Sequence, residues 1–459
     1  MTKVTAINAR DRDAVLTALR SGVVPRRGIH LVQVGRAGEI DALVKDLDRV
    51  AADGSAVRFV IGDFGAGKTF FLSLVRAIAL EKRMVTFTAD LNPARRLHGS
   101  GGQARSLYAE LTRNAATQTK PEGGALGSVV ERFVTSALQK AKSAGTAVET
   151  VIHERLQQLT ELVNGFDFTE VIAAYWRGHD QGNDQLKSDA MRWLRGEFST
   201  KTDARNALGV RAIVDDDEIY DQLKLMARFV RLAGYRGLIV ELDELVNLMK
   251  LPHTQARNSN YEQILRVFND VVQGSAEGLG VIFGGTPETL MDTRRGLFSY
   301  PALQSRLSEN TFARQLGVQD AGGPVIRLAN LGPEDLYVLL TKLRHLQAGG
   351  DPEKYLVPDE AIAGYLDHCN VAIGAAYFNT PRQTIRGWLD FLNVLDQQRG
   401  QSWTDLIGHT TVERETNVDL LEPSDEEELA AAVPVPAPQN TAPPGSERGA
   451  DDDLSGFRL

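Results

Sequence analysis

Apolar and polar residues alternate along the chain in a way that predicts strands separated by helices. Short, almost uninterrupted apolar runs are typical of strands buried on both faces of a parallel sheet. They lie at Val57–Ile61, Met84–Leu91, Gly237–Leu245 and within Leu279–Leu290. Elsewhere apolar residues recur every three or four positions, as they do along Asp216–Ala233, which indicates amphipathic helices. The pattern predicts an α/β fold with a parallel-sheet core.

The same pattern divides the chain into three parts. Residues 1–330 are expected to form the core, which includes a mainly helical region at about 93–235. A compact core does not need so much chain there, so this region is interpreted as an inserted helical module. Its tryptophans, Trp176 and Trp193, are interpreted as core anchors. Residues 331–400 predict a small all-α domain of three helices, because Pro333, Pro358 and Pro381 each stand where a helix would begin.

The tail at 413–459 has a different composition from the rest of the chain. It is rich in acidic residues, proline and alanine, which predicts disorder. It carries twelve acidic and three basic residues, equal to the formal charge of −9 of the whole chain, so the rest is neutral. Leu454–Leu459 regains apolar character, and either a peptide that docks on a partner or a frayed terminus fits it. A neutral body neither demands nor excludes a nucleic-acid partner.

Composition also bears on the compartment. No run approaches the roughly 18 apolar residues that a membrane span requires, so no membrane association is expected. The N-terminal residues have no apolar signal core, and the single cysteine, Cys369, excludes an intrachain disulfide. The expected location is a reducing cytoplasm. Cys369 shares a helical stripe with Ile362 and Tyr365, which indicates a structural thiol.

One motif carries most of the chemical information. The first apolar run leads into GDFGAGKT, which fits G-x-x-x-x-G-K-[ST], the Walker A or P-loop motif. Glycines let backbone N–H groups converge on a polyphosphate, and the N-terminus of the next helix adds its positive dipole end. The residues expected to bind ATP are Gly62, Asp63, Phe64, Gly65, Ala66, Gly67, Lys68, Thr69 and Phe70. Lys68 is expected on the β- and γ-phosphates and the Thr69 hydroxyl on Mg²⁺.

The run GLIVELDEL, Gly237–Leu245, ends in two acids and matches a Walker B strand. Asp243 is expected to hold Mg²⁺ through water, and Glu244 to polarise the water that attacks the γ-phosphate. Glu241 interrupts the apolar run two residues before Asp243, on the same side of the strand. Because a lone buried carboxylate is costly, we expect Glu241 either to face the mouth of the site or to pair with a base.

Two further residues are candidates for sensing the nucleotide. Thr286 follows Gly284 and Gly285 at the end of a strand expected beside the Walker B strand, where a polar side chain reaches the γ-phosphate or its water, the sensor 1 role. Arg382 lies in the first turn of the helix that Thr380 and Pro381 begin. A helix N-terminus disfavours a cation, so a phosphate partner would explain this arginine.

Together these motifs resemble one family, the BREX-system ATP-binding proteins of the BrxD kind, P-loop ATPases related to origin-recognition AAA+ and STAND proteins. The resemblance covers about residues 10–400 and not the tail. It implies an AAA+ core with a helical lid, in which Arg382 is sensor 2. It also implies an arginine finger that reaches a neighbouring subunit, with Arg306 as first candidate and Arg295 as second. Val34, Gly35 and Arg36, before the P-loop, would lie near the base.

The resemblance implies a role in anti-phage defence, beside helicase or DNA-modifying partners. The favoured function is an ATPase that assembles as a homo- or hetero-oligomer and acts as a motor or switch. A DNA-bound initiator or loader is an alternative, but the stretch between Leu395 and Glu413 has no room for a winged-helix domain of about 70 residues. A slow STAND-like signalling switch is a third, although the sequence shows no repeats.

Overall fold

The computed structural model describes residues 7–309, 315, 322–373, 381–398 and 401–408. By its contacts the chain forms two units, Met1–Asn417 and Val418–Leu459. The second unit lies outside the described residues, as do Thr380 and the segment Leu454–Leu459, so the predictions made for them remain predictions.

Five parallel strands form one sheet in the order β2-β3-β4-β1-β5. They are β1 (Ala56–Gly62), β2 (Val85–Asp90), β3 (Leu238–Asp243), β4 (Leu279–Gly285) and β5 (Val325–Leu328). The expectation of a parallel α/β sheet is confirmed, with β4 between β1 and β3. Every residue of β1, β3 and β4 is buried, as the uninterrupted apolar runs of central parallel strands predict.

The fifth strand, β5, was not predicted from the sequence. It has only four residues, and two of them are half-buried because it lies at the edge of the sheet beside β1. A run this short carries little pattern of its own.

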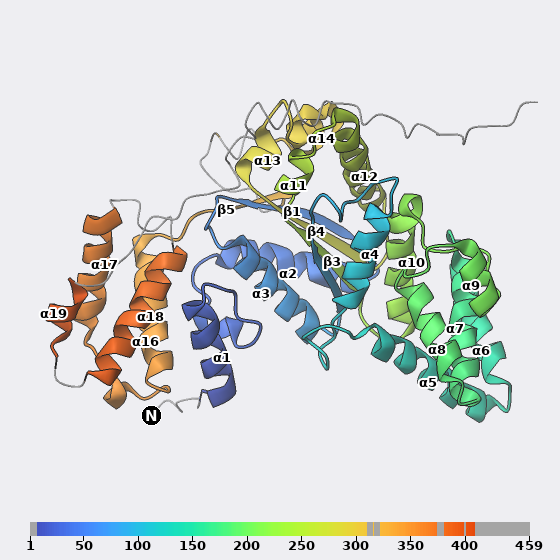
Figure 1. The fold of residues 1–459 in the computed structure, drawn as a ribbon, viewed down its shortest axis with the longest axis horizontal. Coiled ribbons are helices and arrows are strands. Elements are labelled where there is room, and N and C mark those ends of the chain that lie inside the picture. Colours follow the sequence, from blue (N-terminus) through green and yellow to red (C-terminus); the bar gives the residue numbers. More distant parts are fainter. Residues whose placement is uncertain (1–6, 310–314, 316–321, 374–380, 399–400, 409–459) are drawn as a thin grey trace, which may run out of the picture. The chain divides into compact units, whose positions relative to one another are not determined.

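Helices cover both faces of the sheet (Figure 1). On one face α2 (Ala37–Ala51) and α3 (Lys68–Glu81) pack against the strands; on the other lie α10 (Ile219–Leu232), α12 (Thr254–Val272) and α13 (Pro287–Met291). Two further short helices, α11 (Val246–Met249) and α14 (Pro301–Leu307), join this second layer. Because side chains alternate along a strand, β3 sends Ile239, Glu241 and Asp243 towards the α2/α3 face.

The chain between β2 and β3 is helical. It contains α4 (Gln103–Arg113), α5 (Leu126–Ala144), α6 (Val148–Leu156), α7 (Gly165–Asp180), α8 (Asp184–Leu194), α9 (Lys201–Leu208) and then α10. Trp176 and Trp193 are both buried there, as expected of core anchors. The indole of Trp193 donates a hydrogen bond to the carbonyl of Ala212 at 2.8 Å, so its polar atom is satisfied.

A second, all-helical cluster follows the sheet. It consists of α16 (Pro333–Gln347), α17 (Asp359–Ile373), α18 (Pro381–Gln397) and α19 (Trp403–Ile407), together with α1 (Ala9–Arg20) from the other end of the chain. Val15 and Leu16 of α1 share a hydrophobic core with Leu340 and Trp388. Cys369 is fully buried in this core, in keeping with a structural thiol.

Short 3-10 helices complete the described elements. They are η1 (Ile29–Val32), η2 (Gln157–Leu159), η3 (Asp216–Glu218), η4 (Leu297–Ser299) and η5 (Pro352–Lys354). Among the described residues, none of the helices combines the length and the apolar character needed to cross a membrane.

Candidate nucleotide-binding site

The P-loop is a tight turn between β1 and α3. Strand β1 ends at Gly62 and α3 begins at Lys68. Gly67 caps the helix with φ of +79°, a conformation that a residue with a side chain adopts only under strain. The first N–H groups of α3 therefore lie at the end of the loop, where an anion would meet them and the positive end of the helix dipole.

Lys68 folds back across this loop. Its Nζ donates hydrogen bonds to the carbonyls of Gly62 and Asp63, both at 2.9 Å. Burial lowers the pKa of Lys68, and the carboxylates of Asp243 and Glu244 oppose that effect. The ammonium group is thus a cation held beside the loop, in the environment that a phosphate would occupy.

Thr69 and Asp243 meet where α3 faces the end of β3. The Thr69 hydroxyl lies 3.1 Å from Oδ2 of Asp243. The other carboxylate oxygen, Oδ1, accepts the N–H of Glu244 at 2.9 Å. A hydroxyl beside a carboxylate is a pair of hard oxygen donors, so these residues fit a magnesium ion.

Gly284 on β4 makes room for this carboxylate. A Cβ added at Gly284 would lie 2.3 Å from Oδ1 of Asp243. The absence of a side chain at this one position therefore allows the Walker B aspartate to lie flat against the neighbouring strand.

Glu244 and Thr286 stand at the ends of neighbouring strands but in different surroundings. Glu244 is exposed, has φ of +62°, and lines the pocket described below. Positive φ is uncommon for a residue with a side chain and is concentrated at functional sites. Thr286 is buried and caps α13, its Oγ1 3.1 Å from the hydroxyl of Thr289 and accepting the N–H of that residue at 3.4 Å.

Arg36 and Asn330 connect the P-loop to the segment that leads from β5 into the all-helical cluster. The guanidinium of Arg36 donates to the carbonyls of Ala66 and Gly67, and to that of Ala329 at 3.3 Å. The amide of Asn330 donates to the carboxylate of Asp63 at 3.1 Å. Burial lowers the pKa of Arg36, while Glu39 and Asp335 raise it. The loop is therefore held from outside by both connections.

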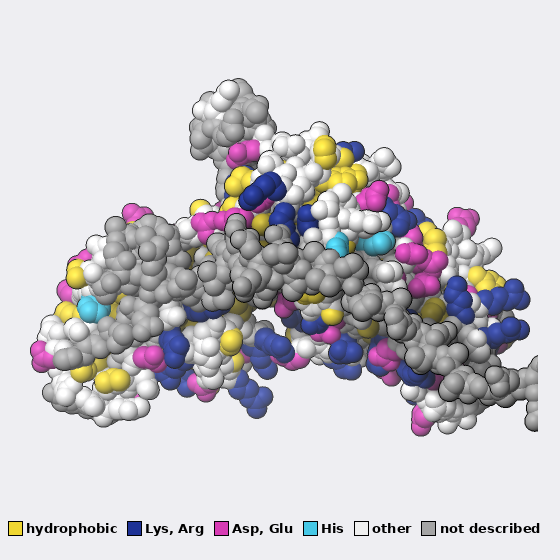
Figure 2. Space-filling view, turned by 45° about the horizontal axis from the view of Figure 1, so that its top comes forward, with side chains coloured by type: hydrophobic (Ala, Val, Ile, Leu, Met, Phe, Trp, Pro, Cys, Tyr) yellow, Lys and Arg dark blue, Asp and Glu magenta, His cyan; other side chains and the backbone are white. Residues whose placement is uncertain are grey.

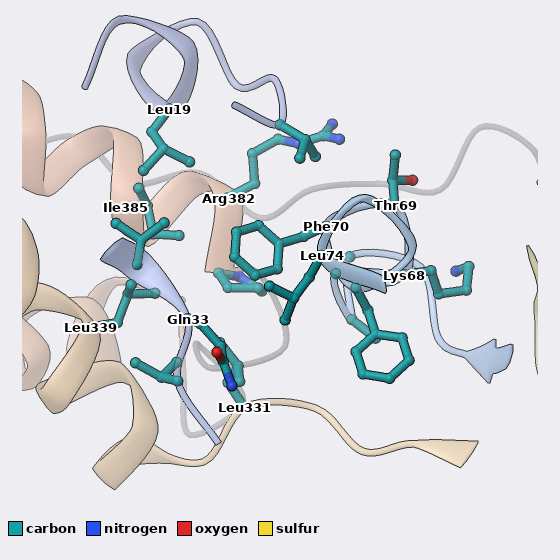
Figure 3. A pocket seen from close by; sticks show the side chains of 18 of the residues that line it. Leu19, Gln33, Lys68, Thr69, Phe70, Leu74, Leu331, Leu339, Arg382 and Ile385 are labelled. Carbon is teal, nitrogen blue, oxygen red and sulfur yellow. The ribbon is translucent and has the colours of Figure 1, made fainter. Parts of the chain in front are cut away.

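A pocket opens beside the P-loop, between η1, α3 and the helices α16 and α18 (Figure 3). Its polar end carries Lys68, Thr69 and Glu244, and Arg36 and Arg382 also line it. The rest is largely apolar. The apolar lining residues include Leu19, Val34, Phe64, Phe70, Leu74, Leu331, Leu339 and Ile385. Gly65, Ala66 and Gly67 line it as well, whereas Gly35, Gly62, Asp63, Asp243, Thr286 and Arg306 do not.

The three arginines predicted to act on the nucleotide lie in different places. Arg382 lines the pocket, its Cδ 3.5 Å from the position of a Cβ added at Gly22. Arg306 is exposed on α14, donating to the side-chain oxygen of Asn269 and to the carbonyl of Ala302, both at 3.0 Å. Arg295 is half-buried and donates to the carbonyl of Leu251 at 3.4 Å.

Glu241 lies inside the protein, away from the mouth of the site. It is 5% exposed, and burial raises its pKa to about 8. Arg76 on α3 opposes this rise. Glu241 therefore does not face the mouth of the site. Arg76 is its basic neighbour, but within the described residues neither a hydrogen bond nor an ion pair joins the two side chains.

With this geometry established, comparison with known families is informative. The model of the family described as BREX system ATP-binding protein BrxC/D matches residues 7–411. The chain belongs to this family. The match confirms the resemblance carried by the motifs, and it covers BrxC and BrxD together. A comparison with curated proteins finds no match.

Membership in this BREX family identifies the chain as an ATP-binding protein of a BREX defence system.

Two residues in or next to the pocket were not predicted from the sequence. Asn330 stands next to an unpredicted strand, and the hydrogen bond to Asp63 spans 267 positions, so no local signal could reveal it. Gln33 lines the apolar part of the pocket just before the Val34-Gly35-Arg36 segment, and its position there was a usable signal.

Proposed function

We propose that this protein is an AAA+-type ATPase, which binds ATP with Mg²⁺, hydrolyses it, and acts as a motor or switch within a BREX defence complex. The observation that carries the proposal is the contact of the Thr69 hydroxyl with Asp243, 3.1 Å apart, beside Lys68 and at the polar end of a pocket. Strand β4, which lies between β1 and β3 and ends at Gly285 just before Thr286, supports the assignment to AAA+.

The pocket supports a nucleotide with its phosphates at the P-loop and its base in the apolar part. Phe70, Leu331 and Ile385 offer apolar surface to the base, and the side-chain amide of Gln33 offers one donor and one acceptor (Figure 3). Val34 and Arg36 lie in the same lining, as the resemblance implied for the base side. In this proposal Arg36 acts mainly on the loop, because its guanidinium donates to loop carbonyls.

The roles of the charged residues follow from their positions. Lys68 leaves the loop carbonyls and binds the β- and γ-phosphates, while Glu244 orients the attacking water. Thr69 and Asp243 would hold Mg²⁺, which would supply charge neutralisation on the phosphates. Thr286 acts as sensor 1 through the end of β4. Arg382 enters from α18 as sensor 2 and makes the position of that helix depend on the nucleotide.

The proposal includes an oligomer in which Arg306 completes the site of a neighbouring subunit. Arg306 is the better candidate than Arg295 because its guanidinium is on the surface, whereas Arg295 is half-buried against Leu251. The partners proposed are other defence proteins, such as a helicase or a DNA-modifying component. DNA itself is a further candidate, although Figure 2 shows Lys and Arg interspersed with Asp and Glu on the face that it draws.

Two substitutions test the ATPase itself. Lys68→Ala should abolish ATP binding, and Glu244→Gln should retain ATP but lower turnover by about 100-fold or more, as expected for loss of a general base. Binding of a fluorescent ATP analogue and release of phosphate measure the two effects. Normal hydrolysis by Glu244→Gln would show that another group orients the water.

The shared site is tested by mixing subunits. Arg306→Ala and Glu244→Gln should each be inactive alone and should regain activity when mixed, because one subunit then supplies the intact finger and the other the intact base. The matched control is a mixture that replaces Arg306→Ala with Arg295→Ala. Activity that neither recovers on mixing nor depends on protein concentration would rule out a finger in trans.

A further inference from the structure

A second pair of polar side chains lies behind Thr69 and Asp243, on the same two elements. Glu241 precedes Asp243 by two residues, so both side chains leave β3 on the face that α3 covers. Arg76 follows Thr69 by seven residues, which returns it to the same side of α3 about two turns further along. Helix α3 thus faces β3 through two successive polar rungs, Thr69/Asp243 in front and Arg76/Glu241 behind.

The rear rung is not needed for a stable sheet. Glu241 lies on β3, where it is paired with Thr88 of β2 on one side and with Ile282 of β4 on the other. Its Oε1 is buried and has no hydrogen-bond partner within the part of the chain that the structure describes. An apolar side chain would fill this position at lower cost, so stability alone does not account for a carboxyl group here.

Arg76 links this rung to the inserted helices. Its Nε donates to the hydroxyl of Thr86 on β2 at 3.4 Å, and its Nη2 donates to the carbonyl of Pro121. Pro121 lies just before α5, in a segment that pairs with the sheet through Ala116 and Thr86. The guanidinium therefore spans from the P-loop helix to the segment between α4 and α5 of the insertion.

We propose that Arg76 and Glu241 are positioning residues for the metal site, which fix α3 against β3 so that Thr69 and Asp243 stay together, and which tie that alignment to the inserted helices. The inference rests on the proposed function, because it assigns a role towards Mg²⁺. Neither side chain lines the nucleotide pocket, so both act through Thr69 and Asp243.

The decisive variant is Glu241→Leu. It removes the polar rung with an apolar side chain of similar size, so thermal unfolding should be unchanged or shifted to higher temperature. The Mg²⁺ concentration for half-maximal binding of a fluorescent ATP analogue should nevertheless rise by about 10-fold, as for other residues that support metal ligands. Affinity for the nucleotide in EDTA should change by less than about 2-fold, since the pocket is untouched.

Two further variants separate positioning from packing. Glu241→Gln keeps the size and a hydrogen-bonding group, so it should recover most of the Mg²⁺ response. Asp46→Asn alters another buried carboxylate on the same face of the sheet, bound to Arg58 under α2, and should lower thermal stability while leaving the Mg²⁺ response unchanged.

The pair is tested as a unit by a double-mutant cycle. Arg76→Met and the combination of Arg76→Met with Glu241→Leu should shift the Mg²⁺ response by about the same factor as Glu241→Leu alone, because residues that act together are not additive. Independent, multiplying effects would show that the two side chains do not work as one rung.

The outcomes distinguish the inference from the function on which it rests. A wild-type chain that binds no nucleotide with Mg²⁺ would overturn both. A wild-type chain that binds nucleotide in a Mg²⁺-dependent way, with an unchanged Mg²⁺ response in Glu241→Leu, would overturn the inference alone.

Discussion

Two arginines lie on the same face of the sheet, the buried Arg58 on β1 under α2 and the half-buried Arg76 on α3, and they are bonded in different ways. Under α2, Arg58 donates from two nitrogens to the carboxylate of Asp46, at 3.2 Å for Nη2, and from the third to the carbonyl of Gly323. Arg76, on α3, donates to Thr86 and Pro121 and makes no direct hydrogen bond to Glu241 within the described residues.

The difference shows that burial of charge does not by itself mark a functional site. The Asp46–Arg58 pair is satisfied on all sides and joins α2 to β1, so it is a structural contact. The Arg76/Glu241 rung is incompletely satisfied and stands next to the residues that fit Mg²⁺. An unsatisfied buried polar group beside a candidate site is the stronger pointer to function.

The largest expected effect tests the structural side of this comparison. Asp46→Ala leaves Arg58 buried without its carboxylate, so it should lower the free energy of unfolding by about 3–5 kcal/mol. Urea unfolding measures this loss, and nucleotide affinity of the folded fraction should stay the same. A loss below about 1 kcal/mol would show that the pair is not the strong contact inferred here.

Two glycines on β4 sharpen the comparison. A Cβ at Gly284 would meet the Asp243 carboxylate, whereas a Cβ at Gly280 would meet the side chain of Ile239 at 2.7 Å. Both Gly→Ala variants should lose about 1–3 kcal/mol of stability through overpacking. Only Gly284→Ala should also weaken Mg²⁺-dependent nucleotide binding, by about 10-fold. Equal Mg²⁺ responses in the two variants would contradict this role of Gly284.

A third arginine shows whether the distinction extends to the P-loop. Arg36→Ala removes hydrogen bonds to the carbonyls of Ala66 and Gly67. The binding free energy of ATP should therefore weaken by about 1.5–3 kcal/mol, which raises the dissociation constant roughly 10- to 100-fold. Isothermal titration with ATP checks the value. Arg344→Ala, on a buried arginine that bonds Val357 and Asp359 within the helical domain, is the control and should affect stability only.

The smallest effect is a pH dependence far from the site. The carboxylate of Glu170, bonded to His153 at 3.0 Å, is the main cause that raises the pKa of His153 above 6.5. The contact therefore stabilises the fold below the unfolded pKa, and the stabilisation disappears as the pH rises through the folded pKa. Glu170→Gln should lower the melting temperature at acidic pH and leave it unchanged at alkaline pH. An NMR titration of His153 checks the shift itself.

Some residues of the candidate site could be predicted from the sequence, whereas others close to them could not. Lys68, Thr69 and Asp243 were predicted because the P-loop and the end of β3 are local patterns that fix where the side chains stand. For Glu241 the sequence left two alternatives open, the mouth of the site or a basic partner, and it could not identify Arg76 as a neighbour because Arg76 approaches from another element. Asn330 was missed for the same reason, since its partner Asp63 is 267 positions away in the sequence. Local periodicity predicts elements, and tertiary packing decides which polar groups meet.

The shared core of α1 with α16 and α18 has one further consequence for motion. Helix α1 continues through η1 into the segment of Gln33 and Arg36, and the carbonyl of Gln33 accepts a hydrogen bond from Lys342 of α16. Helices α16 and α18 are therefore connected to the rest of the protein in two ways, through the chain that leaves β5 and through α1 and η1. They cannot rotate about the β5 connection alone. A rotation of α16 and α18 would also move α1 and, through η1, the segment of Arg36, whose guanidinium bonds the carbonyls of Ala66 and Gly67. The helical cluster is therefore coupled to the phosphate loop through Arg36 as well as through Asn330, which follows β5.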